Sequence, residues 1–134
     1  MYMNKFQIIL SLAVMSVLCS FILQPKPWDV PDEFKMMKNP VKKTDKVMVE
    51  GKIRYNQACA GCHGLKGKGD GEKVKNLANI KPAILMADNV TKGTDGEYFY
   101  KIKYGRGQNH SFSGKLDDEA IWSVIYYMKT FANK

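Results

Sequence analysis

The chain of 134 residues carries 21 Lys and Arg against 13 Asp and Glu, which gives a formal charge of +8 and a pI near 9.4. A chain of this length is expected to form one domain, because it is too short to build a second full hydrophobic core. An apolar content of 45% excludes global disorder. Three cysteines are too few for a disulfide-stapled miniprotein. The net positive charge is compatible with nucleic acid, an anionic membrane or an acidic protein as partner, and it does not distinguish among them.

The chain opens with an apolar segment, because residues 6–23 hold no charged side chain and Lys5 precedes them. Such a run is an export or anchoring segment rather than part of a fold, so residues 1–23 are set apart as signal or anchor. Cleavage, retention as a membrane helix and lipidation of Cys19 are all compatible with it. The run is just long enough to span a bilayer and no clean small-x-small cleavage site follows, which favours retention.

Residues 24–44 are predicted to be an extended tether that lifts a domain off the membrane. Trp28 is expected at the membrane interface, or docked on a partner. The prediction of an extended chain depends on four prolines, which break helices and remove hydrogen-bond donors: Pro25, Pro27, Pro31 and Pro40.

From Asp45 onward the apolar spacing is helical and no alternating strand pattern appears, so residues 45–134 are predicted to form an all-α domain with long loops. Thr44 or Asp45 caps a first helix that runs toward Cys59, and Gly51 in its middle indicates a close packing contact.

Two further helices are predicted, separated by glycine-containing loops over 61–71 and 105–114. A short helix spans Thr94 to Tyr104, capped by Thr94 or Asp95. A last helix begins after Asp117, and its apolar face recurs at helical spacing: Ile121, Ile125, Met128 and Ala132.

The sharpest motif is the five-residue run Cys59-Ala60-Gly61-Cys62-His63. Two thiols at this spacing can each form a thioether with one vinyl group of a haem, and the adjacent imidazole then becomes the proximal iron ligand. A zinc site would need two more ligands, and His110 is the only other histidine. A thiol–disulfide redox protein without haem is the remaining alternative, but it would need a preceding strand and leaves His63 unexplained.

Residues 55–71, YNQACAGCHGLKGKGDG, resemble the attachment segment of class I, single-haem cytochromes c. The resemblance extends over about residues 47–132 and includes the last segment, LDDEAIWSVIYYMKTF. It implies a small helical domain packed round one covalent haem c, with the first and last helices crossing at right angles. Gly51 and Tyr55 would then meet a face of the last helix formed by Trp122, Ile125 and Tyr126.

The same resemblance assigns ligand roles around the iron. The carbonyl of Pro82 would accept a hydrogen bond from the second nitrogen of His63 and make it a better donor. The family's distal methionine position is occupied by Asn109, so three arrangements stay open. His110 can bind the iron, which we favour; Met86 can reach it from the middle loop; or the site is open or weakly held by Asn109.

The tether sequence WDVPDEFKMMKNPV is similar to that preceding the single-haem subunit of alternative complex III, through Trp28, Pro31, Asn39 and Pro40. The resemblances imply a membrane-tethered electron-transfer protein rather than an enzyme, on the periplasmic side of a bacterial cell membrane. It would act as a carrier or complex subunit, with a quinol-oxidising complex or terminal oxidase as redox partner and no nucleic acid. A haem sensor or peroxidase-like protein with an open distal site is the alternative.

Five lysines near the attachment segment have two interpretations. They form either a solvated face or a positive rim that steers an acidic redox partner, and nearby acids dilute the charge. They are Lys66, Lys68, Lys73, Lys75 and Lys81.

A first prediction concerns the sixth ligand. Replacing His110 by Ala removes the favoured imidazole, so the ferric absorbance spectrum should lose its low-spin bands. Unchanged low-spin bands would refute bis-histidine ligation, and a thioether charge-transfer band would assign the position to Met86.

Overall fold

The structure, a computed structural model, describes residues 4, 5, 7, 9, 28–76, 85, 92–106 and 111–133. Its elements contain no β-strand, so the all-α prediction is confirmed for this part of the chain. In order they are α2 (Asp32–Lys35), α3 (Asp45–Ala58), α4 (Ala60–His63), the 3-10 helix η1 (Glu72–Asn76), α6 (Asp95–Tyr104), α7 (Asp118–Met128) and the 3-10 helix η2 (Lys129–Asn133).

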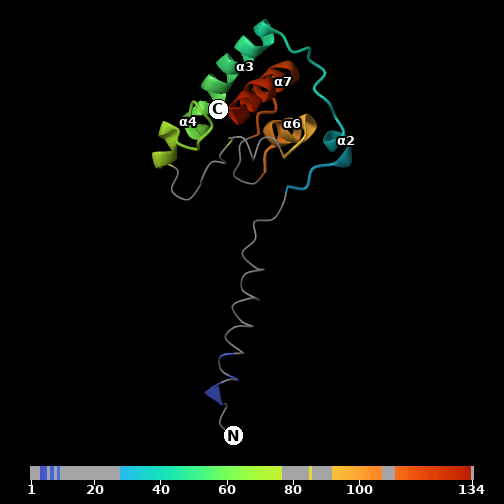
Figure 1. The fold of residues 1–134 in the computed structure, drawn as a ribbon. Helices are drawn as coiled ribbons and strands as arrows, with labels where there is room; N and C mark the ends of the chain where they lie inside the picture. Colours follow the sequence, from blue (N-terminus) through green and yellow to red (C-terminus); the bar gives the residue numbers. More distant parts are fainter. Residues whose placement is uncertain are drawn as a thin grey trace.

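The helices follow one another across the domain in the order α3, α7, α6 and α2 (Figure 1). The short α4 and η1 continue from the far end of α3. Within the described residues every helix is too short or too polar to cross a bilayer. The predicted anchor over residues 6–23, with Cys19, lies almost wholly outside the described residues.

Each of the three longer helices begins at a predicted cap. The side chains of Thr44 and Thr94 accept hydrogen bonds from first-turn N–H groups of α3 and α6, at 3.3 and 3.2 Å. Glu97 reciprocates at α6 by accepting from the Thr94 N–H at 2.7 Å, which completes a capping box. Asp117 accepts from a first-turn N–H of α7 at 2.7 Å. Local sequence therefore determines where these helices start.

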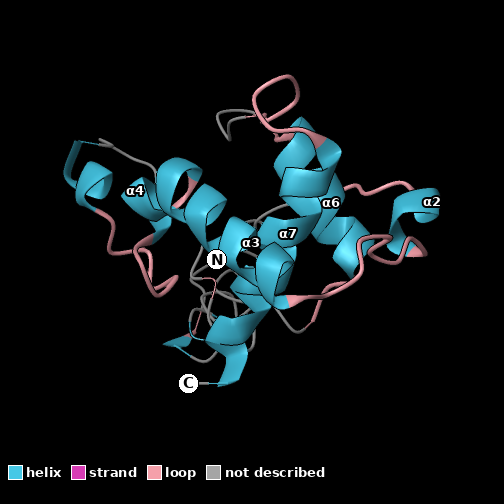
Figure 2. Ribbon diagram, turned by 90° about the horizontal axis from the view of Figure 1, so that it is seen from above, coloured by secondary structure: helices cyan, strands magenta, loops and turns pink. Residues whose placement is uncertain are grey.

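The core is built where α3 packs on α7 (Figure 2). Gly51 is buried there, and a Cβ at this position would collide with the carbonyl group of Ser123, whose carbon lies 2.7 Å away. The same Cβ would lie 3.2 Å from the Cβ of Tyr127. Glycine thus lets the two backbones approach, as the sequence predicted.

The face of α7 that α3 meets differs from the one implied by the cytochrome c resemblance. Gly51 approaches Ser123 and Tyr127, whereas the expected Trp122 stacks on Phe99 of α6 with ring centroids 4.2 Å apart. For Gly51 the expected contact is therefore wrong by one residue, because it meets Ser123 and not Trp122, whereas Ile125 shares the core with Tyr55 as expected. A small side chain opposite a glycine gives the closest backbone approach, and the large Trp122 ring is instead used to pack α6 on α7.

The apolar face predicted for the last helix is buried. Ile121, Ile125 and Met128 are at most 4% exposed, and Tyr55 of α3 is fully buried beside them. Tyr98 and Phe99 of α6 join the same core. Among the described helices, α7 therefore contributes the largest share of the buried apolar side chains.

The described part of the predicted tether is not simply extended. Residues 28–44 contain α2 and pack on α6 and α7, with Val30 only 3% exposed. Pro31 does not prevent α2, because proline is tolerated at a helix start, where the N–H has no helical partner. The position at which the domain begins, residue 45, stays a prediction.

A second prediction tests the α3–α7 contact. Replacing Gly51 by Ala should lower the free energy of unfolding by about 1–3 kcal/mol, because Ser123 contributes rigid backbone that must move aside. Guanidinium unfolding of the purified protein measures the change. Lys52→Ala, at the next and exposed position of α3, is the matched control and should be close to neutral. A Gly51→Ala protein as stable as the wild type would contradict the close contact.

Candidate functional site

The sequence-predicted motif residues come together on one helical turn. Cys59 ends α3 and begins α4, and His63 is the last residue of α4. The N–H groups of Cys62 and His63 donate to the carbonyl oxygen of Cys59 at 3.1 and 2.9 Å. Both thiols and the imidazole are thereby fixed to one rigid turn at the end of the longest described helix.

The two cysteines are free thiols, and both are partly exposed. Burial, with a smaller contribution from neighbouring Cys62, raises the pKa of the Cys59 thiol to about 12. Cys59 is therefore a protonated thiol at neutral pH and has little thiolate character, which argues against a thiol–disulfide exchange role.

The chain after His63 returns to brace this turn. Gly69 donates its N–H to the carbonyl oxygen of His63 at 2.8 Å, and Gly71 donates to that of Cys62 at 3.2 Å. Gly64 adopts a φ of 79°, which reverses the chain direction at the point where α4 ends. A side chain on Gly71 would collide with the backbone of Gly61, so the returning loop needs glycine to come this close.

Tyr55 fastens the turn to the core. Its hydroxyl donates to the carbonyl oxygen of Gly64 at 2.8 Å, and its ring contacts those of Tyr127 and Phe131 at 5.4 and 5.1 Å between centroids. Burial raises the pKa of the Tyr55 phenol, so the neutral donor is maintained well into alkaline solution. The motif turn is thus linked directly to the α3–η2 packing.

The residues present fit a c-type haem. Two thiols three positions apart and an adjacent imidazole project from one braced turn, and Ala60 and Gly61 between the thiols are small. Cys59 and Cys62 could form the two thioethers and His63 the proximal bond. No group of three His, Cys, Asp or Glu residues able to hold a metal ion is found among the described residues, so the zinc alternative gains no support there.

Several predicted site residues lie outside the described part of the chain. Pro82, Met86, Asn109 and His110 are among them, so the sixth ligand and the partner of His63 stay predictions. The chain is described again from Ser111, whose hydroxyl donates to the carbonyl oxygen of Lys103 in α6 at 2.6 Å.

Sequence reasoning missed one contact at the site. The side chain of Lys73, in η1, lies over Gly61, with its Cδ 3.0 Å from where a Cβ would stand. The aliphatic stem therefore packs on the motif turn, although the sequence indicated only a charged rim. Gly61 in the motif was the available signal, because a glycine leaves room for such an approach.

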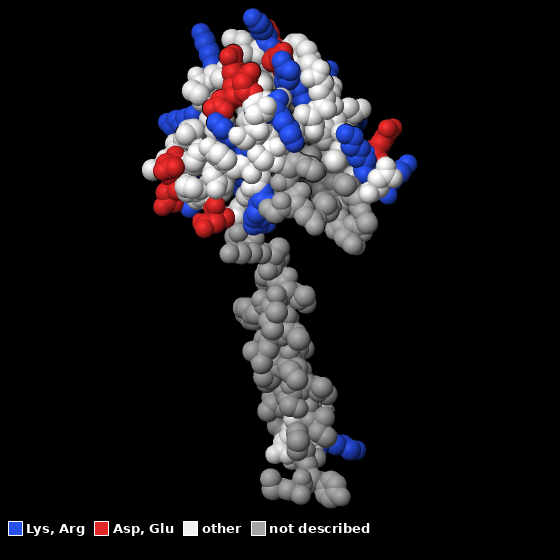
Figure 3. Space-filling view, turned by 180° about the vertical axis from the view of Figure 1, so that it is seen from behind, with Lys and Arg blue, Asp and Glu red and all other residues white. Residues whose placement is uncertain are grey.

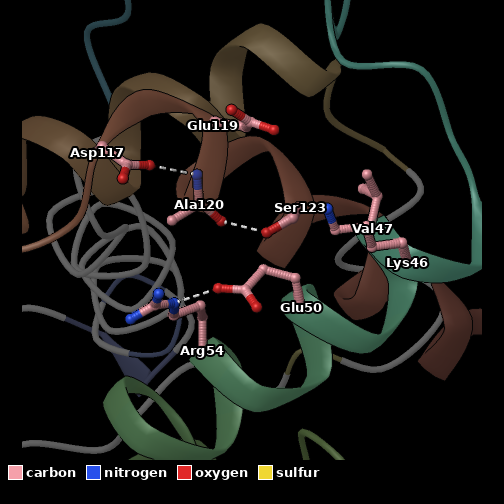
Figure 4. A pocket seen from close by; sticks show the side chains of 8 residues that line it. All are labelled: Lys46, Val47, Glu50, Arg54, Asp117, Glu119, Ala120 and Ser123. Carbon is pink, nitrogen blue, oxygen red and sulfur yellow. Dashed lines mark hydrogen bonds and ion pairs between the residues drawn. The ribbon is translucent and has the colours of Figure 1, made fainter.

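A groove between α3 and the start of α7 does not form a second site. Glu50 and Arg54 line it and pair with each other at 2.6 Å, and Asp117 is engaged by the N–H of Ala120 (Figure 4). Lys46 and Glu119 also line the groove, but the motif turn contributes nothing to its lining.

Fold and site together define a small c-type cytochrome domain. The chain belongs to the family described as cytochrome c oxidase, cbb3-type, subunit III, whose model matches residues 47–128, more than half of the chain. The prediction of a class I type of cytochrome c is thereby confirmed. Membership implies a c-type haem and electron transfer as the general activity.

A solved structure that resembles the chain is the reducing HAO-like protein complex of Kuenenia stuttgartiensis. The TM-score is 0.57 at 21% sequence identity, so the likeness concerns the fold alone. The match covers 84% of this chain and 53% of that one, so this chain spans about half the length of the chain it matches. No curated protein sequence matches it.

A third prediction follows from the Tyr55 anchor. Tyr55→Phe should cost about 1 kcal/mol of unfolding free energy at pH 7, because one buried hydrogen bond is lost while Gly64 still accepts from the N–H of Gly67. The pKa of the Tyr55 phenol is higher in the folded protein than in the unfolded chain, where it is about 10. The wild type therefore keeps its full stability below pH 10 and loses stability as the pH rises above that value, because the unfolded chain releases the phenol proton first. The difference between the two proteins should therefore shrink above pH 10, as measured by denaturant unfolding across that range. A difference that stays constant with pH would exclude this role for the phenol.

Proposed function

We propose that this protein transfers single electrons through one c-type haem held by Cys59, Cys62 and His63. The observation that supports it most directly is the braced turn of α4, which presents two thiols and an imidazole together inside a domain of a cytochrome c family. When bound, the haem supplies the ferrous–ferric couple, and the protein contributes attachment, ligation and a dry surrounding.

Attachment needs no external oxidant. Cys59 and Cys62 would hold the haem by addition of each S–H across one vinyl C=C bond, with sulfur bonded to one carbon and hydrogen to the other. Burial raises the pKa of the Cys59 thiol, so the group available for this addition is the S–H form. The backbone of His63 is held by the Gly69 hydrogen bond to its carbonyl, on the same short helix as Cys62.

For the sixth position we propose His110, with Met86 or an open site as the other arrangements. An imidazole there would stabilise ferric iron and lower the potential, whereas a thioether would raise it. A low potential would suit a donor-side step, close to a quinol-oxidising complex.

For the location we propose the periplasmic side of a bacterial cell membrane, reached through the apolar segment at residues 6–23 or lipidated Cys19. This proposal is supported by sequence alone, since the c-type attachment motif and an export segment agree with each other.

For the partner we propose a redox protein of the same respiratory chain. Four of the five predicted rim lysines are described and exposed: Lys66, Lys68, Lys73 and Lys75. Asp70 and Glu72 are exposed among them, and the face seen from behind also mixes basic and acidic side chains (Figure 3). The charge near the motif is therefore a moderate steering field rather than a dense patch.

A fourth prediction tests attachment. Cys59→Ala and Cys62→Ala should each leave one thioether, and the double variant should lose haem on denaturation. A pyridine haemochrome assay after denaturation and extraction measures what remains covalently bound. Cys19→Ala is the matched control, since it removes a cysteine outside the motif and should retain haem like the wild type. Absence of covalent haem in the wild type would overturn the proposal. Rapid binding of carbon monoxide by the ferrous protein would indicate an open iron site and a ligand-binding function in place of the carrier function.

A further inference from the structure

The segment between the predicted anchor and α3 is attached to the domain at several separate points. Val30 is 3% exposed, and Phe34 and Val41 pack against the hydrophobic core. We call residues 28–44 the strap. Besides the cap that Thr44 forms on α3, its contacts are with α6 and α7, in the C-terminal half of the domain.

Phe34 of α2 is the apolar anchor of the strap. Its ring lies 4.9 Å from that of Tyr100, 5.8 Å from Tyr104 and 6.3 Å from Phe99, measured between centroids. Three aromatic neighbours on one helix give this ring a specific seat on α6.

Gly96 makes this seat possible. A Cβ there would collide with the carbonyl oxygen of Phe34 and would lie 2.8 Å from the Cβ of Met37. The backbone of the strap therefore lies directly on the first turn of α6, and a side chain at Gly96 would push it away.

Two hydrogen bonds join the second half of the strap to α7. Asn39 donates its side-chain amide to the carbonyl oxygen of Trp122 at 3.0 Å and accepts from the N–H of Val41 at 3.0 Å. The hydroxyl of Tyr126 donates to the carbonyl oxygen of Val41 at 2.8 Å. Asn39 thus uses both ends of its amide group, which fixes the local chain on α7.

The beginning of the strap is fixed as well. The guanidinium carbon of Arg106, just after α6, lies 4.6 Å from the centroid of the Trp28 ring. A cation over an indole face at this distance is attractive, and both residue types are favoured at the membrane–water interface.

Docking of the strap changes the reach of the domain. A free tether over residues 24–44 could extend at most about 75 Å at about 3.6 Å per residue, whereas the four residues 24–27 can extend at most about 14 Å. This upper bound follows from covalent geometry and holds for any conformation of those four residues. A domain with a docked strap therefore cannot leave the end of the apolar segment by more than about 14 Å, which is about twice the thickness of one headgroup layer.

We propose that the strap holds the cytochrome domain at the membrane surface, with the Trp28–Arg106 pair facing the headgroups. The electron partner is then a protein of the same membrane, with its redox group accessible close to the membrane surface. It is not a protein that lies farther out in the periplasm. This inference rests on the proposed haem and on membrane anchorage through residues 6–23.

The experiment measures the height of the haem above the bilayer. The full-length protein is reconstituted into vesicles that contain a small fraction of dansyl-labelled phosphatidylethanolamine, whose emission the haem quenches by energy transfer. The release variant is Phe34→Ala with Asn39→Ala, which removes both kinds of strap contact. The matched control is Glu33→Ala with Met36→Ala, two exposed residues of the same segment. A further protein carries a flexible 17-residue Gly/Ser insertion between Pro27 and Trp28.

We expect strong quenching by the wild type and the control, and loss of most of it in the release variant and the insertion protein. Trypsin should cleave after the strap lysines, such as Lys35 and Lys42, faster in the release variant than in the wild type. The insertion protein keeps its strap contacts, so it should lose quenching without gaining cleavage.

Three results would overturn the inference. They are equal quenching by the wild type and the release variant, equal cleavage of their straps, and full quenching by the insertion protein. A negative haemochrome assay would instead refute the proposed function, and a protein that washes off the vesicles would refute the anchor. Failure of the strap is therefore distinguishable from failure of either premise.

Discussion

The close approach of α3 and α7 at Gly51 is the contact on which the rest of the domain depends. Because no side chain intervenes between Gly51 and the Ser123 carbonyl, the two helices bring Tyr55 against Tyr127 and Phe131. Tyr55 in turn holds the Gly64 carbonyl and with it the end of the motif turn. The position of the two thiols and His63 therefore depends on a backbone contact about two turns away along α3 as well as on the loop that braces them.

Much of this fold is encoded locally, which explains why the sequence predicted it. Thr44, Thr94 and Asp117 cap their helices through hydrogen bonds to residues three positions ahead. The Cys59–His63 motif is equally local, since one helical turn brings its members together. The predicted residues with cofactor roles outside that turn, Pro82, Met86 and His110, lie beyond the described residues and remain predictions.

Features that depend on distant partners were predicted poorly. Pro31 and Pro40 favour an extended chain through their local backbone geometry. They do not indicate the partners of the strap, because Trp122 lies 83 residues from Asn39 and Tyr126 lies 85 residues from Val41. The face of α7 was assigned one residue off, because Trp122 is an obvious packing residue while Ser123 is inconspicuous. The 3-10 helix η1 was also missed, since Glu72–Asn76 is too short and too polar to show an apolar period.

The hydrogen bonds of Asn39 and Tyr126 also constrain the order in which the molecule is assembled. They join the first described segment to the last long helix, so they cannot form until α7 has been synthesised. Contacts of such sequence separation require a loop-closure entropy cost to be met before they can stabilise the chain. A truncated chain lacking α7 would therefore leave Asn39 and Val41 without their hydrogen-bond partners Trp122 and Tyr126, although Phe34 could still pack on α6. The docked form of the strap therefore requires both ends of the domain, the strap itself and α7.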